Sequence, residues 1–366
     1  MFLLDATLRE GAQSPDARLT PRRQLAILRG LAAVGVEEAE IGCASRDRDL
    51  GGLVRAARRA APGLRLSVWC RGLPADLALG AASGADVVHA SLPVSRLHLT
   101  RRLGKDEAWL HEQIPRAAEA ARRAGARSVA LGLEDATRAE PGLLAVACAR
   151  AREAGFDRLR LADTVSVASP ARLAALVGLA RTAFAGPVGV HCHDDFALAT
   201  GNAVAALEAG AAWVDGCLLG GGERAGTART EALCAWLAVH GGRAYRLAAL
   251  PGLCRLAASA LGRRIPAHAP VVGEAIWRAA SGLHVDGLAK EPGCYEPFDP
   301  ARVGACRELL LGPLSGRAAV GQALRLQRRT HRDADIERIL SILGRRGTPM
   351  AMAAIGDLDN ESVYAG

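Results

Sequence analysis

The chain has 366 residues, of which 50% are hydrophobic and only 4% aromatic, so a large core of mainly Ala, Leu and Val is available. Charged residues make up 23% of the chain, which excludes wholesale disorder. The net charge is +8, but basic residues are scattered and no nucleic-acid-binding module is recognisable, so we expect no nucleic-acid partner. No apolar run is long enough to span a bilayer, and the start does not resemble a signal peptide. We therefore expect no membrane partner. Nine cysteines, an odd number with no CxxC pair, argue against a disulfide framework, so we expect a cytoplasmic protein.

Short β-rich runs recur eight times within the first 220 residues, separated by Ala-, Leu- and Arg-rich segments with helical periodicity. The interval averages about 30 residues, the size of one βα unit. In the first interval, Thr20 can cap a helix that Pro21 begins and Gly35 ends. Eight such units predict a TIM (β/α)8 barrel, and no GxGxxG motif follows a strand to support a dinucleotide-binding sheet. The predicted strands are residues 2–5, 38–42, 64–70, 86–92, 128–134, 158–164, 187–193 and 213–219.

The strand rhythm stops after about residue 245. We therefore predict two domains, a catalytic barrel over 1–245 and a helical C-terminal region over 246–366. A Gly- and Pro-rich segment over 281–304 is expected to be an irregular linker or lid that carries His284. The expected helices of this region are 247–265, 268–282, 317–330 and 333–346.

Polar residues follow the predicted barrel strands, where the active site of such a fold lies. His191 and His193 are two apart on one strand, so both imidazoles face the barrel interior while Cys192 turns outward. Two neutral imidazoles and a carboxylate form a common divalent-metal site, and Glu10 can supply the carboxylate from the first strand. The alternative is two hydrogen-bonded core histidines. We predict one Mg²⁺, Mn²⁺ or Zn²⁺ ion bound by Glu10, His191 and His193.

Five motifs resemble those of the metal-dependent acetyl-CoA condensing enzymes, namely the isopropylmalate, citramalate and homocitrate synthases, with 3-hydroxy-3-methylglutaryl-CoA lyase as a cousin. The similarity covers residues 1–325, and four phrases (VWCRG, SLPVSRLHL, LGLEDATRAE and HDDFALAT) resemble the nitrogen-fixation type of homocitrate synthase. The five motifs are DATLREGAQ (5–13), ADTV (162–165), HCHDDFALATGNAVAALEAGA (191–211), GGGERAG (220–226) and SGLHVDGLAK (281–290).

The resemblance implies roles for particular residues in binding a 2-oxo acid. Arg9 would aid the carbonyl and the developing negative charge, although it could instead form a structural ion pair with Glu134 or Asp135. Thr164 would bind the substrate carboxylate, or else cap a strand end, and Gln13 is a further substrate-binding candidate. Asn202 would lie in or beside the metal shell, with a helix cap as the alternative.

The resemblance also implies that acetyl-CoA is the co-substrate. His284 would act in the active site of a partner subunit, with residues 275–300 reaching over the partner barrel of a homodimer; its alternative is a surface position. Glu134 corresponds to a carboxylate near the reacting centre. Arg71 could bind the distal carboxylate of 2-oxoglutarate, or simply face solvent.

Several residues depart from the family pattern and leave alternatives open. The departures are Ala12, Thr227, Ala279, Pro313 and Leu314. The expected function is homocitrate synthesis, which serves the nitrogenase cofactor or lysine biosynthesis. The alternatives are a citramalate or 2-isopropylmalate synthase using pyruvate or 2-oxoisovalerate, and a non-catalytic paralogue. A lyase is disfavoured, because the loop GGGERAG lacks the Cys of that enzyme.

Overall fold

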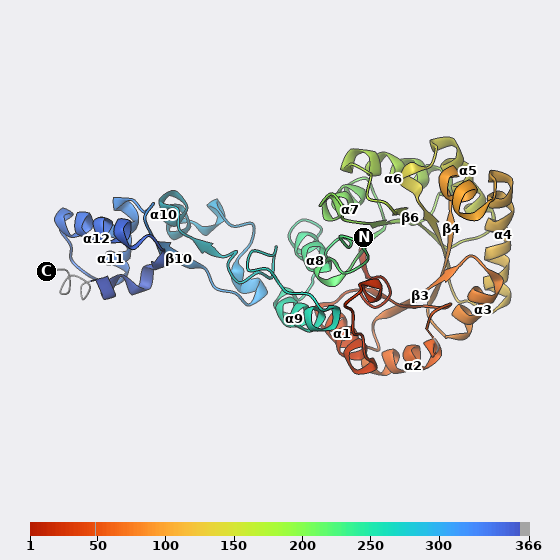
Figure 1. The fold of residues 1–366 in the computed structure, drawn as a ribbon, viewed down its shortest axis with the longest axis horizontal. Coiled ribbons are helices and arrows are strands. Elements are labelled where there is room, and N and C mark those ends of the chain that lie inside the picture. Colours follow the sequence, from red (N-terminus) through yellow and green to blue (C-terminus); the bar gives the residue numbers. More distant parts are fainter. Residues whose placement is uncertain (48, 359–366) are drawn as a thin grey trace. The chain divides into compact units, whose positions relative to one another are not determined.

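The computed structural model describes residues 1–47 and 49–358. Within the first compact unit, Met1–Ile265, eight parallel strands follow one another around a closed barrel, and pairing of β1 with β8 completes the ring (Figure 1). The eight-stranded prediction is confirmed, with ends that differ by up to three residues. The strands are β1 (Phe2–Asp5), β2 (Glu38–Cys43), β3 (Arg65–Arg71), β4 (Val87–Pro93), β5 (Val129–Glu134), β6 (Arg158–Asp163), β7 (Val188–Cys192) and β8 (Trp213–Gly216).

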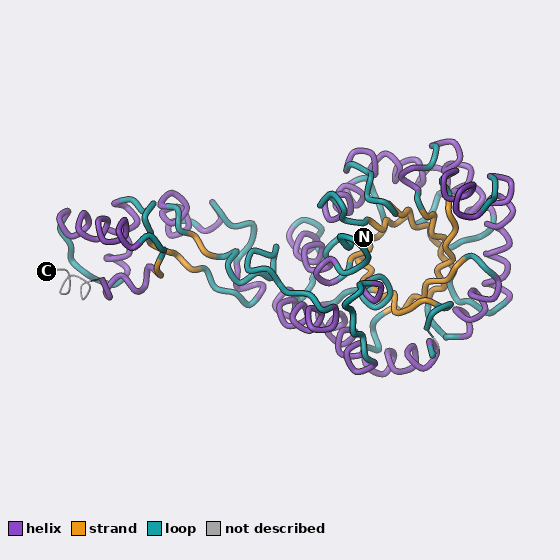
Figure 2. Tube along the Cα trace, viewed as in Figure 1, coloured by secondary structure: helices purple, strands orange, loops and turns teal. Residues whose placement is uncertain are grey.

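Helices surround the strands on the outside of the barrel (Figure 2). The first begins as predicted: the Thr20 side chain accepts a hydrogen bond from the Arg23 amide, Pro21 is the first helical residue, and Gly35 ends the helix with a φ of 98°. The helices are α1 (Pro21–Val34), α2 (Leu50–Ala60), α3 (Pro74–Ala82), α4 (Glu107–Arg123), α5 (Pro141–Glu153), α6 (Pro170–Phe184), α7 (Ala199–Glu208) and α8 (Thr230–Val239). Among the described residues, no helix has the length and apolar character needed to cross a membrane.

A further helix, α9 (Leu250–Leu261), also belongs to the barrel unit. It packs against α1, where Gly30 leaves space for the side chain of Leu253. The compact unit therefore extends to Ile265 and not to residue 245, where the predicted boundary lies. The strand pattern alone could not place this helix, because α9 has no strand after it.

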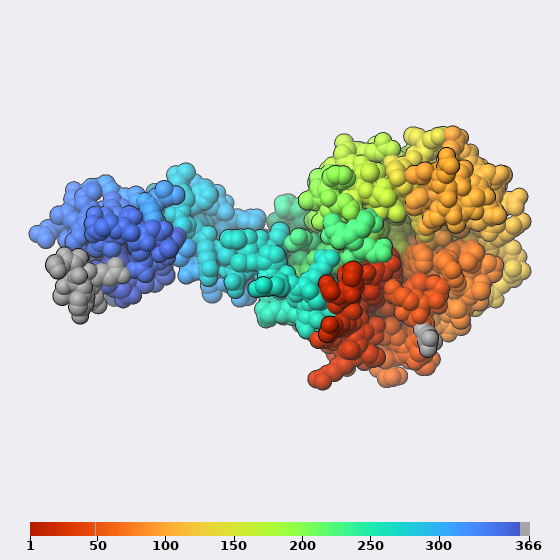
Figure 3. Space-filling view, viewed as in Figure 1, coloured from red at the N-terminus to blue at the C-terminus, as the bar shows by residue number. Residues whose placement is uncertain are grey.

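Side chains fill the ring that appears open in the tube drawing (Figures 2 and 3). Part of this filling is ionic: Arg158 on β6 donates two hydrogen bonds across the barrel to Glu38 on β2. Two residues further along the same strands, Arg160 bonds to Glu40 at 3.0 Å. Because alternate residues of a strand face the same side, these four buried residues form two successive charged layers.

The second unit begins at Pro266 and has its own apolar core, which includes Val285, Val320 and Ile339. It contains helices, as predicted, and also a three-stranded sheet in the order β11-β10-β9. The predicted helix over 268–282 is wrong, because Pro270 lies in a turn and a short strand follows at residues 278–279. A helix begins at Gly282, in the segment that was expected to be irregular. The elements are β9 (Arg278–Ala279), α10 (Gly282–Lys290), β10 (Glu308–Leu311), α11 (Arg317–Leu326), α12 (Asp333–Arg346) and β11 (Met350–Ala351).

Candidate active site and metal centre

A cavity of about 240 Å³ lies at the C-terminal ends of the barrel strands. Its lining residues come from seven different strands or the segments that follow them. They are therefore far apart in the sequence. Most of the lining side chains are polar or charged, so the cavity suits a small anionic ligand. The lining residues are Arg9, Glu10, Gln13, Trp69, Ser91, Arg102, Gly132, Glu134, Arg160, Ala162, Thr164, His191, His193, Glu223 and Arg224.

Glu10, His191 and His193 lie close together in the lining of this cavity. Each offers one donor atom, and these atoms lie within 4.8 Å of one another. All three residues are buried, and Glu10 Oε1 and His193 Nδ1 have no hydrogen-bond partner among the described residues. Unpaired buried acceptors are costly unless something binds them. A carboxylate and two imidazoles fit a divalent cation, in agreement with the predicted ligand set.

The charge states of these groups favour cation binding. Burial, the neighbouring imidazole and Arg9 hold the pKa of His191 well below 6.5, and burial also lowers the pKa of His193. Both rings are therefore neutral near pH 7, the form that binds metals. Burial alone would raise the pKa of Glu10, but Arg9, His191 and His193 together outweigh it, and the net shift is downward. Glu10 is thus a carboxylate.

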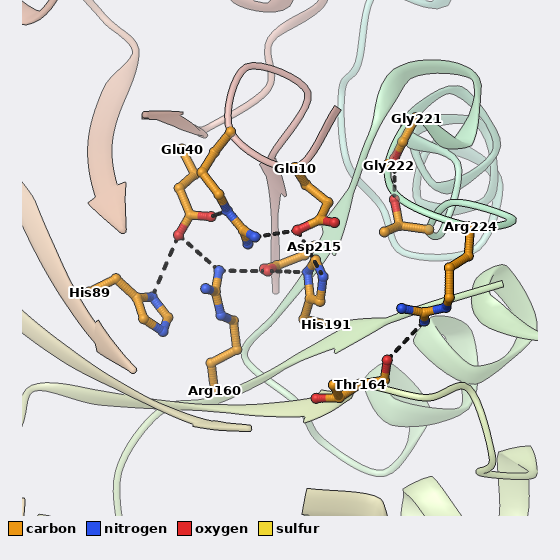
Figure 4. A network of polar contacts seen from close by, with 12 residues as sticks. Glu10, Glu40, His89, Arg160, Thr164, His191, Asp215, Gly221, Gly222 and Arg224 are labelled. Carbon is orange, nitrogen blue, oxygen red and sulfur yellow. Dashed lines mark hydrogen bonds and ion pairs between the residues drawn. The ribbon is translucent and has the colours of Figure 1, made fainter. Parts of the chain in front are cut away.

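A chain of buried ion pairs links two of the three residues, Glu10 and His191 (Figure 4). Negatively charged carboxylates alternate with positively charged guanidiniums along the chain, which begins at Glu10 and ends at His191. The sequence interpretation missed this chain, although charged residues at alternate positions of two buried strands were a visible signal. Its links are Glu10 to Arg9, Arg9 to Glu40, Glu40 to Arg160, Arg160 to Asp215, and Asp215 to His191. Arg9 therefore pairs with Glu10 and Glu40, and not with Glu134 or Asp135.

Glu134 also lines the cavity, at the end of β5. Its carboxylate accepts a hydrogen bond from the Ser91 hydroxyl at 2.9 Å and one from Arg102 at 2.5 Å. Arg102 comes from the π-helical turn His98–Leu103 after β4, and its side chain is 50% exposed. Nothing in the sequence distinguished this arginine from its many neighbours. It is a cation in contact with both the cavity and solvent.

Thr164 follows β6 and lines the cavity. Its hydroxyl oxygen accepts a hydrogen bond from the Asp135 amide at 2.8 Å, so the hydroxyl hydrogen is still available to a ligand. Its carbonyl accepts a hydrogen bond from Arg224 (Figure 4). Arg224 also pairs with Asp195. Thr227, one of the departures from the family pattern, donates to the carbonyl of Gly221 at 3.1 Å and helps to hold the glycine-rich loop.

Three predicted site residues lie elsewhere. Arg71 is drawn away by a two-bond ion pair with the buried Asp76, at 2.7 and 2.9 Å, and does not line the cavity. This corrects the expected position of Arg71. Asn202 is fully buried on α7 and donates to the carbonyl of Ala168 at 2.9 Å, and it too is absent from the lining. His284 belongs to the second unit, where it is exposed on α10 with its ring 4.4 Å from that of Tyr295.

Comparison with known proteins decides the family. The HMGL-like family model matches residues 1–257, which is more than half of the chain. The chain belongs to the HMGL-like family. A second model, described as the homocitrate synthase post-HMGL domain, matches residues 271–345 and corresponds to the second unit. The HMGL-like chain is therefore an enzyme of the homocitrate synthase-like acyltransferase kind, as predicted.

Individual relatives of this HMGL-like enzyme fall into more than one substrate group. It is 38% identical to a homocitrate synthase of Frankia alni over 87% of this chain and 92% of that protein. It is 37% identical to a protein of Methanosphaerula palustris named provisionally as an (R)-citramalate synthase, over 87% of this chain and 64% of that protein. The structure of the HMG-CoA lyase of Bacillus subtilis has a TM-score of 0.64 and 18% identity, covering 72% of this chain and 95% of that one, and it supports the fold alone.

Proposed function

We propose that this enzyme is a homocitrate synthase, which condenses acetyl-CoA with 2-oxoglutarate and hydrolyses the thioester to release homocitrate and CoA. The observation that carries the proposal is the cavity that contains both the buried triad Glu10, His191 and His193 and, on its wall, the cation Arg102. The 2-oxo acid group of 2-oxoglutarate suits a cation held by the triad, and its second carboxylate suits Arg102. The 38% identity to a homocitrate synthase over nearly its whole length supports the same substrate.

The roles of the chain's own residues follow from their contacts. Glu10, His191 and His193 would hold a divalent cation, which when bound supplies Lewis-acid polarisation of the substrate ketone. Arg9, fixed by Glu10 and Glu40, presents a guanidinium to the cavity, where it stabilises negative charge that develops during condensation. Thr164 donates its hydroxyl hydrogen to the carboxylate next to the ketone, and Gln13 is a second polar group for it.

The tail of the keto acid requires a different partner from the one that the sequence suggested. Arg71 is engaged with Asp76 outside the cavity, so we assign the distal carboxylate to Arg102. A guanidinium can bind a carboxylate through two parallel hydrogen bonds. Arg102 uses one nitrogen for Glu134, which leaves other donors of its planar fork for substrate.

The second half of the reaction needs a base that removes a proton from the acetyl-CoA methyl group. We assign this role to His284 of a partner subunit in a homodimer, with Glu134 close to the reacting carbon. His284 is exposed and its ring packs on Tyr295, so it can be presented to another molecule. In this proposal, each active site is complete only when two chains associate.

Citramalate synthesis from pyruvate is the second candidate. The ion pair between Arg102 and Glu134 already neutralises the cation, which favours a keto acid without a second charge. Identity to the provisional citramalate synthase, at 37%, is almost the same as to the homocitrate synthase. Release of free CoA thiol from acetyl-CoA, measured with 2-oxoglutarate, pyruvate and 2-oxoisovalerate in turn, distinguishes the two functions.

A further inference from the structure

The two candidate histidine ligands differ in what holds their rings. His191 Nδ1 lies 3.0 Å from Oδ2 of Asp215, and both side chains are almost completely buried. His193 Nδ1 is also buried but has no hydrogen-bond partner among the described residues. One imidazole is thus anchored by a carboxylate from the neighbouring strand β8, while the other lacks such an anchor.

The contacts of Asp215 determine which atom of this hydrogen bond is the donor. Its Oδ1 accepts from the indole N–H of Trp213 at 3.2 Å, and its Oδ2 accepts from Arg160 at 2.7 Å. With donors directed at both oxygens, Asp215 is the acceptor and His191 Nδ1 carries the hydrogen. In a neutral imidazole the lone pair then lies on Nε2. Nε2 of His191 lies 3.9 Å from Oε2 of Glu10, another member of the triad.

Asp215 is itself held firmly. Arg160 bonds to both Asp215 and Glu40, and its side chain is 4% exposed (Figure 4). Glu40 in turn binds Arg9, which pairs with Glu10. The same chain of ion pairs therefore ends on two members of the triad, His191 at one end and Glu10 at the other. A shift of Asp215 would break contacts on several strands at once.

We propose that Asp215 is a positioning residue: it fixes the tautomer and ring orientation of His191 so that Nε2 faces Glu10 and His193, and Arg160 and Trp213 hold it in place for this role. The inference rests on the proposed function only in taking the triad as a cation site. Hydrogen bonds of this kind to a metal-binding histidine typically change metal affinity by about 10- to 100-fold.

The first test measures binding of Mn²⁺ alone to the metal-free full-length protein by isothermal titration calorimetry. Asp215→Ala should weaken binding about 10- to 100-fold. Asp215→Asn keeps a carbonyl oxygen that can accept a hydrogen bond from Nδ1, so its loss of Mn²⁺ affinity should be smaller. This variant replaces Asp215→Ala in the test if the alanine variant does not fold. Asp76→Asn is the matched control, because it too removes the charge of a buried, arginine-paired aspartate, but away from the cavity, and its Mn²⁺ affinity should be unchanged.

The second test detects the tautomer directly, by ¹⁵N NMR of the histidine side chains in the metal-free protein. The signal of His191, identified by its loss in His191→Gln, should show a protonated Nδ1 in the wild type and a shift toward protonated Nε2 in Asp215→Ala. Wild-type affinity together with an unchanged tautomer in Asp215→Ala would overturn the inference. If the wild type binds no Mn²⁺, the proposed function fails, whereas the tautomer still decides the role of Asp215.

Discussion

Replacing Arg102 with alanine tests the assignment of the keto-acid tail. A hydrogen bond to a charged group contributes about 1.5–3 kcal/mol, and the lower half of that range applies here because half of the Arg102 side chain is exposed. We therefore expect kcat/KM for 2-oxoglutarate to fall about 10- to 40-fold. Loss of Arg102 also leaves the Glu134 carboxylate without its counter-charge beside the position assigned to the distal carboxylate, and it repels that second carboxylate further. The value for pyruvate should change little, because pyruvate has no second carboxylate.

The assay is steady-state thiol release with each keto acid at saturating acetyl-CoA. Arg71→Ala is the control, because it removes an arginine of the same rim that pairs with Asp76 and does not line the cavity. Its kcat/KM should stay within about twofold of wild type, because neither Arg71 nor its partner Asp76 lines the cavity. Equal losses with 2-oxoglutarate and pyruvate in Arg102→Ala would refute the assignment and limit Arg102 to holding Glu134.

Three further predictions concern the metal, the assembly and the pH dependence of stability. Chelation should abolish thiol release and added Mn²⁺ should restore it in the wild type but not in Glu10→Gln; activity that survives exhaustive chelation would exclude the metal site. Mixing and re-associating the inactive variants Glu10→Gln and His284→Gln should recover about a quarter of wild-type activity if each site needs both chains, and none if one chain supplies everything. Burial raises the pKa of Glu231 from 4.5 to about 7, so the folded protein favours the protonated carboxyl. The resulting stabilisation is complete below pH 4.5 and is lost as the pH rises through 7. In urea unfolding, the free energy of unfolding of Glu231→Gln should rise by about 3 kcal/mol relative to that of the wild type between pH 4.5 and pH 8. Parallel pH profiles of the two proteins would show that Glu231 is not the source of this pH dependence.

Local patterns were sufficient to predict the barrel and the triad. Each strand is a short apolar run between helical segments, and His191 and His193 share a face because they are two apart on β7. Glu10 could be added because barrel strands deliver their C-terminal residues to one rim. These inferences depend on spacing within one element or on a rule of the fold, and neither requires knowledge of particular contacts.

Pairings between distant side chains could not be predicted in the same way. Arg71 and Arg102 are both arginines on the rim, and only the positions of Asp76 and Glu134 decide which one lines the cavity. The sheet of the second unit was missed because β9 and β11 have two residues each, too few to show any periodicity. Its strands are also joined by long intervening segments.

The reaction proposed for this HMGL-like enzyme is the condensation of acetyl-CoA with 2-oxoglutarate. The most direct measurement is the rate of CoA thiol release by the wild-type protein with Mn²⁺ and equal concentrations of 2-oxoglutarate, pyruvate and 2-oxoisovalerate, with the product identified by mass spectrometry. We predict the highest kcat/KM with 2-oxoglutarate and homocitrate as the product. Faster release with pyruvate or 2-oxoisovalerate, or no release with any of the three, would contradict the claim.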